Sequence, residues 1–135
     1  NVTAGVTQTM TQTLRLTTSD IQYKGNTVWH AGNFDPGSIP QNAKTAAYTL
    51  VATDAGKHIS ITTGGVTVPS GVFSIGDAVT IYNDSTSNQT ITASGVTLRI
   101  AGSATSGNKT LAQYGLATLL CVASNVFVIG GAGVS

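Results

Sequence analysis

Few side chains in this sequence are of the kinds that perform catalysis. Histidine occurs at two positions, His30 and His58, and all five acidic residues are aspartates. A Ser–His–Asp site needs a histidine beside a nucleophile and an acid, and glycoside hydrolysis needs a pair of carboxylates. The sequence has no Gly-x-Ser-x-Gly turn, and its aspartates, such as Asp84, stand among turn-forming residues. We therefore expect no catalytic residues and no enzymatic activity.

Metal binding by the histidines has little support as well. Neither His30 nor His58 has a second histidine one residue away that would complete a pair of ligands. Three copies of His30 around a symmetry axis could meet a metal ion, and a hydrogen-bonded structural histidine is the other interpretation. We expect no metal site and no cofactor.

The chemistry that the sequence leaves open is hydrogen bonding to sugars. Polysaccharides are held by planar hydrogen-bonding side chains and by aromatic faces, and residues 82–88 and 106–109, the latter together with Tyr114, offer both. The candidate receptor-binding residues are Tyr82, Asn83, Asp84, Ser87, Asn88, Asn108 and Tyr114. The same residue types also make ordinary polar turns. Trp29, the only tryptophan, could likewise stack on a sugar or pack inside the protein.

The composition excludes several classes of partner. The formal net charge is +1 and the six Lys and Arg residues are scattered, which is too little positive charge to grip a phosphate backbone. We therefore expect no nucleic acid as a partner. No apolar run reaches the roughly 18 residues of a membrane span, so no membrane insertion is expected. The single cysteine, Cys121, stands in an apolar run, where we expect it to be buried and without a disulfide.

Residues that favour strands dominate the chain, and we expect an all-β protein. Glu is absent, and Thr, Val and Gly are frequent, which disfavours helices and suits strands and tight turns. We expect strands at residues 46–53, 58–62, 66–68, 77–83, 89–93, 96–100, 111–123 and 126–129. Short strands at intervals of about 8–12 residues predict a β-sandwich of the jelly-roll kind.

Residues 1–40 differ from the rest and predict a shaft or neck segment. Thr occupies nearly every odd position from residue 7 to 17, so threonine lines one face of an extended strand there. Residues 21–30 predict a hairpin with a Gly-containing turn, and residues 31–40 are rich in breakers and predict a linker. We therefore expect an intertwined strand and hairpin segment at 1–40 and a C-terminal β-sandwich tip domain at 41–135.

The segment of residues 116–123 is apolar on both of its strand faces. A strand of this kind is covered on both sides: the core covers one face, and a neighbouring subunit could cover the other. A short buried helix is the alternative, which the β-branched residues and the nearby Gly130-Gly131 disfavour. Charged residues make up only 8% of the chain, so the sheet edges lack the charges that usually protect them. Both features predict a symmetric oligomer.

Three segments resemble phage tail fibre proteins. Residues 23–34, with the sequence YKGNTVWHAGNF, are similar to the fibre signature YNGNTVWHAGN, in which Asn stands where this chain has Lys24. Residues 47–59 and 114–119 are similar to the opening and to a late segment of C-terminal fibre domains. The resemblance implies a homotrimer wound about one axis, with a β-sandwich-like, receptor-binding tip.

We accordingly expect the distal end of a tail fibre, located at the fibre tip of the virion and outside the cell. Its partners would be two further copies of the chain and a bacterial surface glycan, either lipopolysaccharide or capsule. Three weak sites on one axis would raise avidity without new contacts. The alternative is a structural shaft, connector or trimerisation domain with no receptor site of its own. A polysaccharide-cleaving tailspike is disfavoured by the short chain and the absence of Glu.

Overall fold

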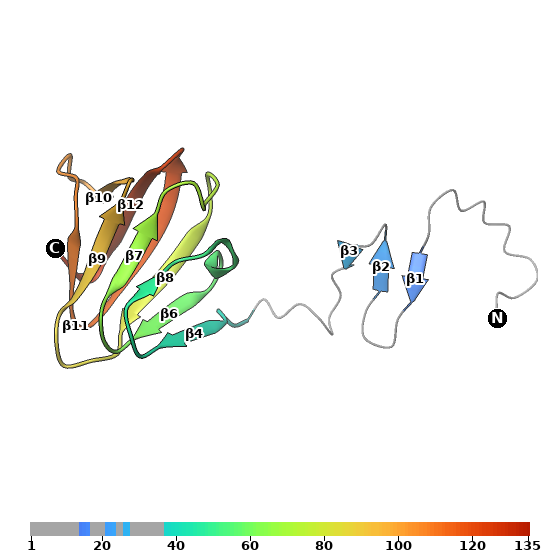
Figure 1. Cartoon of the computed structure of the whole chain (residues 1–135), viewed down its shortest axis with the longest axis horizontal. Coiled ribbons are helices and arrows are strands. Elements are labelled where there is room, and N and C mark those ends of the chain that lie inside the picture. Colours follow the sequence, from blue (N-terminus) through green and yellow to red (C-terminus); the bar gives the residue numbers. More distant parts are fainter. Residues whose placement is uncertain (1–13, 17–20, 24–25, 28–36) are drawn as a thin grey trace, which may run out of the picture. The chain divides into compact units, whose positions relative to one another are not determined.

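The computed structural model describes residues 14–16, 21–23, 26–27 and 37–135, and the chain divides into two compact units. The first unit, Asn1–Ser38, contains β1 (Leu14–Leu16), β2 (Ile21–Tyr23) and β3 (Asn26–Thr27), which form a three-stranded antiparallel sheet (Figure 1). The pairing of Tyr23 with Asn26 fits the hairpin predicted there. Trp29, His30, most of the threonine-lined strand and most of the linker lie outside the described residues.

The second unit, Ile39–Ser135, is built of nine strands and one short 3-10 helix. In chain order these are β4 (Gln41–Lys44), β5 (Tyr48–Thr49), η1 (Ala52–Asp54), β6 (His58–Ile61), β7 (Val66–Pro69), β8 (Ala78–Asn83), β9 (Gln89–Ser94), β10 (Thr97–Ile100), β11 (Lys109–Ala123) and β12 (Val126–Val134). The all-β prediction is confirmed for the part of the chain that the structure describes.

Strands β4 to β9 wind into a coil of two layers. β4, β6 and β8 lie side by side in parallel and form one layer, and β5, β7 and β9 do the same in the other (Figure 1). The chain changes layer at each step, so every turn of the coil adds one strand to each layer. Successive turns pass close together at Gly64 and Gly65, where a Cβ atom would clash with the backbone of Ala47 and of Thr90. These two positions therefore require glycine.

The long strand β11 joins the two layers. Its residues 109–111 pair with β9, whereas residues 116–120 pair with β8, so the strand bends from one layer into the other. β12 follows β11 as its antiparallel partner on both sides of the bend, and β10 pairs in parallel with β12. A Cβ atom at Gly131 of β12 would clash with the Leu116 carbonyl, so glycine is needed where the two strands bend together. The nine strands thus form one nearly closed sheet folded into two layers.

The core lies between the layers and is made by inward-facing residues that alternate along the strands. In β8, Val79 and Ile81 are buried while their neighbours are only partly so, and complete burial of such a side chain contributes about 1.5–3 kcal/mol. Phe127 of β12 is also buried, and the ring of Phe73 meets it edge-on with centroids 6.0 Å apart. Cys121 is buried in this core as predicted, and its burial raises the pKa of the thiol.

The strands differ in part from those that the sequence predicts. Residues 116–123 belong to β11, so the strand interpretation of this segment is confirmed and the buried helix is wrong. The jelly-roll detail is not shown, because a jelly roll is built of antiparallel strands, whereas β4 to β9 pair with one another in parallel. The strand expected at residues 46–53 is reduced to Tyr48–Thr49, since η1 begins two residues after it, at Ala52.

Candidate functional site

The loop that follows β8 is held in place by Asn83, the last residue of that strand. Asn83 is completely buried. Its Nδ2 donates hydrogen bonds to the carbonyls of Leu111 (3.1 Å), Ala112 (2.8 Å) and Ser87 (2.7 Å), and its Oδ1 accepts one from Ser85 Oγ (2.7 Å). The sequence analysis put Asn83 among the receptor contacts. Its side-chain amide is instead hydrogen-bonded within the protein, so Asn83 positions the loop and is not free to contact a receptor.

Gln89, the first residue of β9, fixes the other end of the loop. It is 7% exposed, and its Oε1 accepts a hydrogen bond from Gly65 N at 2.9 Å. Its Nε2 donates to Thr62 O and to Ser85 Oγ, at 3.1 Å each. Fully bonded buried amides rigidify the segments that they join. Gln89 was not among the predicted residues, although its place two residues before the inward-facing Ile91 is a signal for such a role.

Tyr114 lies at the bend of β11 and brings an aromatic ring to the surface. Its φ is +55° and 56% of the residue is exposed. A bulky side chain in this left-handed region is uncommon and costs about 1–2 kcal/mol. The N–H of Tyr114 donates to Ser85 O at 3.2 Å, and the N–H of Gln113 donates to Asn88 Oδ1 at 3.3 Å. The loop therefore holds the bend in a conformation that the chain would otherwise avoid.

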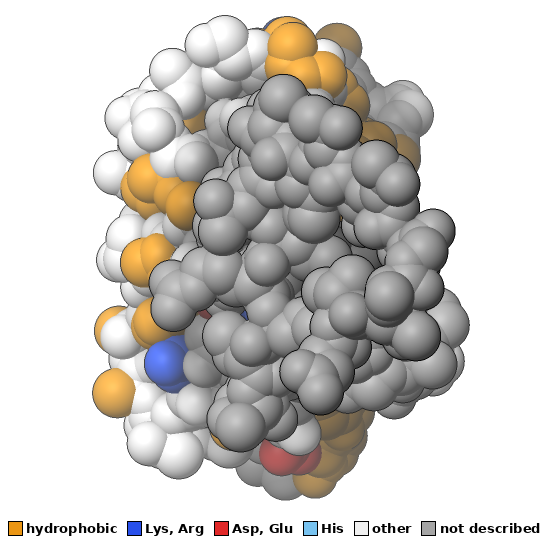
Figure 2. Space-filling model, turned by 90° about the vertical axis from the view of Figure 1, so that its right-hand side faces the viewer, with side chains coloured by type: hydrophobic (Ala, Val, Ile, Leu, Met, Phe, Trp, Pro, Cys, Tyr) orange, Lys and Arg blue, Asp and Glu red, His pale blue; other side chains and the backbone are white. Residues whose placement is uncertain are grey.

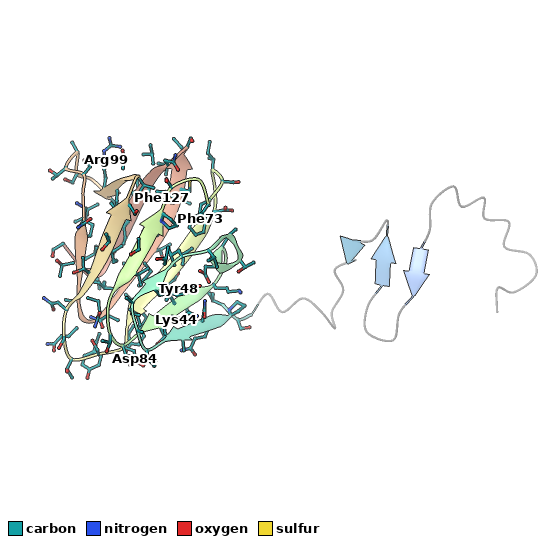
Figure 3. The ribbon with its side chains drawn as sticks, in the orientation of Figure 1. Lys44, Tyr48, Phe73, Asp84, Arg99 and Phe127 are labelled. Atoms are coloured by element: carbon teal, nitrogen blue, oxygen red, sulfur yellow. The ribbon has the colours of Figure 1, made fainter. Side chains whose placement is uncertain are left out.

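Three other predicted residues, Asp84, Ser87 and Asn88, are exposed on the same loop. Within the described residues the Asp84 carboxylate has no hydrogen bond or ion pair, and Figure 3 shows Asp84 at one end of the second unit. We call Asp84, Ser87, Asn88 and Tyr114 the Tyr114 end. It combines carboxylate, hydroxyl and amide groups with an aromatic face, a set that can hydrogen-bond sugar hydroxyls and stack on a sugar ring.

Tyr82 and Asn108 do not belong to this exposed group. Tyr82 is half-buried in β8, opposite Leu116 of β11. Asn108 Oδ1 accepts a hydrogen bond from Ala93 N at 2.9 Å, and Ala93 lies about 13 Å along β9 from the residue that anchors the loop. The structure therefore separates Asn108 from Tyr114, which the sequence had grouped with it.

Exposed apolar side chains gather along β11. Leu116, Leu120 and Val122 are 50%, 40% and 42% exposed and point outward from this strand; we call them the β11 stripe. Their partners on the neighbouring strands, such as Ala78 and Val128 on either side of Leu120, carry no charge. On the coloured part of the surface in Figure 2, charged side chains are likewise few among hydrophobic and uncharged ones.

A second buried polar cluster surrounds Asp54 in the first turn of the coil. Asp54 is 1% exposed and accepts hydrogen bonds from Asn42 Nδ2 (2.8 Å), Tyr48 Oη (2.9 Å) and Val51 N–H (2.9 Å). Burial works to raise the pKa of Asp54, but these bonds and a nearby lysine outweigh it, so the pKa lies below its ordinary value. The ammonium of Lys44 lies 4.2 Å from the Tyr48 ring centroid. Because these groups satisfy one another, the cluster stabilises the first turn and presents nothing to a ligand.

The part of the chain that the structure describes contains neither a cluster of metal ligands nor a membrane-spanning helix. No three His, Cys, Asp or Glu side chains are grouped there as metal ligands. His58 Nδ1 lies 3.1 Å from the carbonyl oxygen of Ile39, which is a structural hydrogen bond. None of the helical segments in these residues has the length and hydrophobicity to cross a membrane.

Comparison with known proteins adds no identification. No protein-family model, no curated protein and no solved structure matches this chain. A functional proposal therefore depends on the arrangement of the residues themselves.

Proposed function

We propose that the chain is the distal part of a trimeric phage tail fibre and attaches the virion to a bacterial surface polysaccharide, either lipopolysaccharide or capsule. The observation that carries this proposal is the Tyr114 end, where a rigid loop holds an exposed aromatic ring in a strained backbone conformation. Strained residues persist only where the surroundings enforce them, and they cluster at ligand sites. The segments similar to fibre proteins support the same conclusion.

In the proposed complex, the ring of Tyr114 stacks on a sugar ring, while Asp84 and Ser87 hydrogen-bond to its hydroxyls. Asn83 and Gln89 already keep the loop in one conformation, so little conformational freedom is lost on binding. Each contact is weak, and three copies on one fibre raise the avidity. The proposed function is binding alone, with no bond cleavage.

The β11 stripe is the proposed contact with the other copies of the chain. Contiguous apolar side chains exposed on a sheet face are typical of protein contact sites. Leu116, Leu120 and Val122 form such a row, with the uncharged Thr118 between the first two. Because the paired neighbours of Leu116 and Leu120 carry no charge, identical faces can meet there without like-charge repulsion. A second and a third copy therefore suit this face better than a charged partner does.

Binding of the purified protein to lipopolysaccharide and capsule of candidate hosts tests the proposal, by surface plasmon resonance and by adsorption to whole cells. Tyr114→Asn removes the ring but suits a left-handed backbone, and Tyr114→Phe keeps the ring as the matched control. We expect the wild type and the Phe variant to bind, and the Asn variant to lose at least about tenfold in affinity. Equal affinities of the Asn variant and the wild type would contradict the proposed site.

A structural shaft or connector is the second candidate. It is favoured by the inward use of Asn83, Ser85 and Gln89, whose polar side chains all bond within the protein. Under this alternative the residues at the bend of β11 only build a corner of the sandwich. A wild-type protein that forms trimers and yet binds no host cell and no surface glycan would favour the structural function.

A further inference from the structure

Within the part of the chain that the structure describes, Lys109 is a buried cation with one weak partner. It is 7% exposed and lies opposite Ile91 of β9, and it alternates with the buried Leu111, so it points to the inner face of the sheet. Its Nζ donates to the carbonyl oxygen of Thr105 at 3.5 Å. This distance exceeds the roughly 2.7–3.2 Å of a good hydrogen bond. Since an ammonium has three donors, most of its hydrogen-bonding capacity is unused.

No carboxylate neutralises this ammonium within residues 37–135. The chain contains no Asp or Glu after Asp84, and Figure 3 shows Asp84 and Arg99 at opposite ends of the second unit. Arg99 belongs to the Lys109 end, because it pairs with Ser106, the neighbour of Thr105. Burial of an unpaired charge is unfavourable. The same end also carries Asp77, whose carboxylate accepts the N–H of Ser74 at 2.8 Å. It therefore holds two cations, one carboxylate and the unused donors of Lys109.

The segment between β10 and β11 adds hydroxyl groups to this end. Its Ser103 Oγ accepts a hydrogen bond from Thr105 N at 3.2 Å, and its pairing with Arg99 folds the segment back along β10. Ser103, Thr105 and Ser106 are all exposed. Their hydroxyls thus lie on the same short segment that the Lys109 ammonium contacts.

We propose that Lys109 binds an oxyanion, the carboxylate or phosphate group of an acidic glycan, at the end of the second unit away from Asp84. The oxyanion would accept hydrogen bonds from the N–H groups of the Lys109 ammonium that do not bond to Thr105. Such charge-assisted hydrogen bonds are stronger than those between neutral groups. The positive charge of Arg99 favours the same ligands. Because the site shares no residue with the Tyr114 end, it does not depend on the proposed receptor site.

Amide NMR of the whole chain, titrated with sodium phosphate, with sodium glucuronate and with neutral glucose at constant ionic strength, tests the site. We expect saturable shifts of the Thr105 and Ser106 signals with phosphate or glucuronate, and none with glucose or chloride. The anion whose signal shifts saturate at the lower concentration shows whether the site prefers a phosphate or a carboxylate group. Lys109→Met keeps the apolar stem of the side chain and should weaken the response at least about tenfold.

The titration of the wild type tests anion binding at Lys109 even if the Lys109→Met variant fails to fold. Absence of a saturable shift with both anions in the wild type would overturn the proposal, and so would an equal response of a folded Lys109→Met variant. Tyr114→Asn separates the two sites: we expect it to retain anion binding. Loss of the anion response in that variant would contradict an independent Lys109 site.

Discussion

Tyr114 donates its backbone N–H to the carbonyl oxygen of Ser85 across 3.2 Å, and this bond fastens the bend of β11 to the loop after β8. The same bend is held by Asn83, which bonds the carbonyls of Leu111 and Ala112 just before it. The exposed ring therefore sits at a corner braced from the core of the second unit, and the strain at Tyr114 is balanced by buried hydrogen bonds.

Asn83→Ala should lower the free energy of unfolding by about 2–4 kcal/mol, because buried carbonyls lose their donor. Chemical denaturation measures the change. Asp84→Ala, at the exposed neighbouring position, is the matched control and should change stability by less than about 0.5 kcal/mol. Similar small effects of both substitutions would show that the Asn83 amide does not hold the loop.

Substitutions at Tyr114 should separate stability from binding. Asn tolerates a left-handed backbone, so Tyr114→Asn should leave the free energy of unfolding unchanged or raise it by up to about 1 kcal/mol. Tyr114→Val places a β-branched side chain there and should lower it by about 1–2 kcal/mol. Thermal and urea unfolding of the two variants check the order. If Tyr114→Val is at least as stable as Tyr114→Asn, residue 114 does not have the positive φ described above.

Leu120→Lys should dissociate the proposed trimer, because it places a charge in the middle of the uncharged β11 stripe. Analytical ultracentrifugation should find three copies for the wild type and single, folded chains for the variant. Thr90→Lys, on an exposed position of β9 in the other layer, is the control and should stay trimeric. A wild type that sediments as a monomer at every concentration tested would refute the proposed contact.

Asp54 should make stability depend on acid. Its pKa in the folded protein lies below the ordinary value of 3.8, so its stabilisation is present above that value and is lost as the pH falls through the folded pKa. Asp54→Asn should therefore be less stable than the wild type at neutral pH. The difference should narrow below about pH 4. Urea unfolding of both proteins across this pH range measures the difference in their free energies of unfolding. A difference that stays constant with pH would rule out a lowered pKa of Asp54.

The alternation of buried and exposed residues in β8 and β11 could be seen in the sequence, and so could the apolar outer face at residues 116–123. The parallel coil could not, because alternation fixes the buried face of a strand and not its partner. β4 shows this most clearly. Gln41–Lys44 has no large apolar residue, and the segment becomes a strand because it pairs in parallel with β6.

The candidate site was predicted only in part. The loop residues and Tyr114 were named from their types, and the structure brings most of them together. The alternation of Val79 and Ile81 in β8 continues to Asn83 and puts it on the inner face, a signal that the choice of receptor contacts overlooked. The sequence offered no way to see that Asn108 lies apart from Tyr114, since this follows from its bond to Ala93 in β9. The one local sign of that bend is Gly115 after Tyr114, where an added Cβ atom would approach Ala112 O to 2.8 Å.

β11 is hydrogen-bonded to β8, β9 and β12, and Tyr114 lies at its bend. A pull on this residue directed along the strand acts at right angles to the bonds of its antiparallel ladders. Those bonds would stretch together in shear instead of opening one after another. The second unit is therefore suited to resist a force applied at Tyr114 along β11.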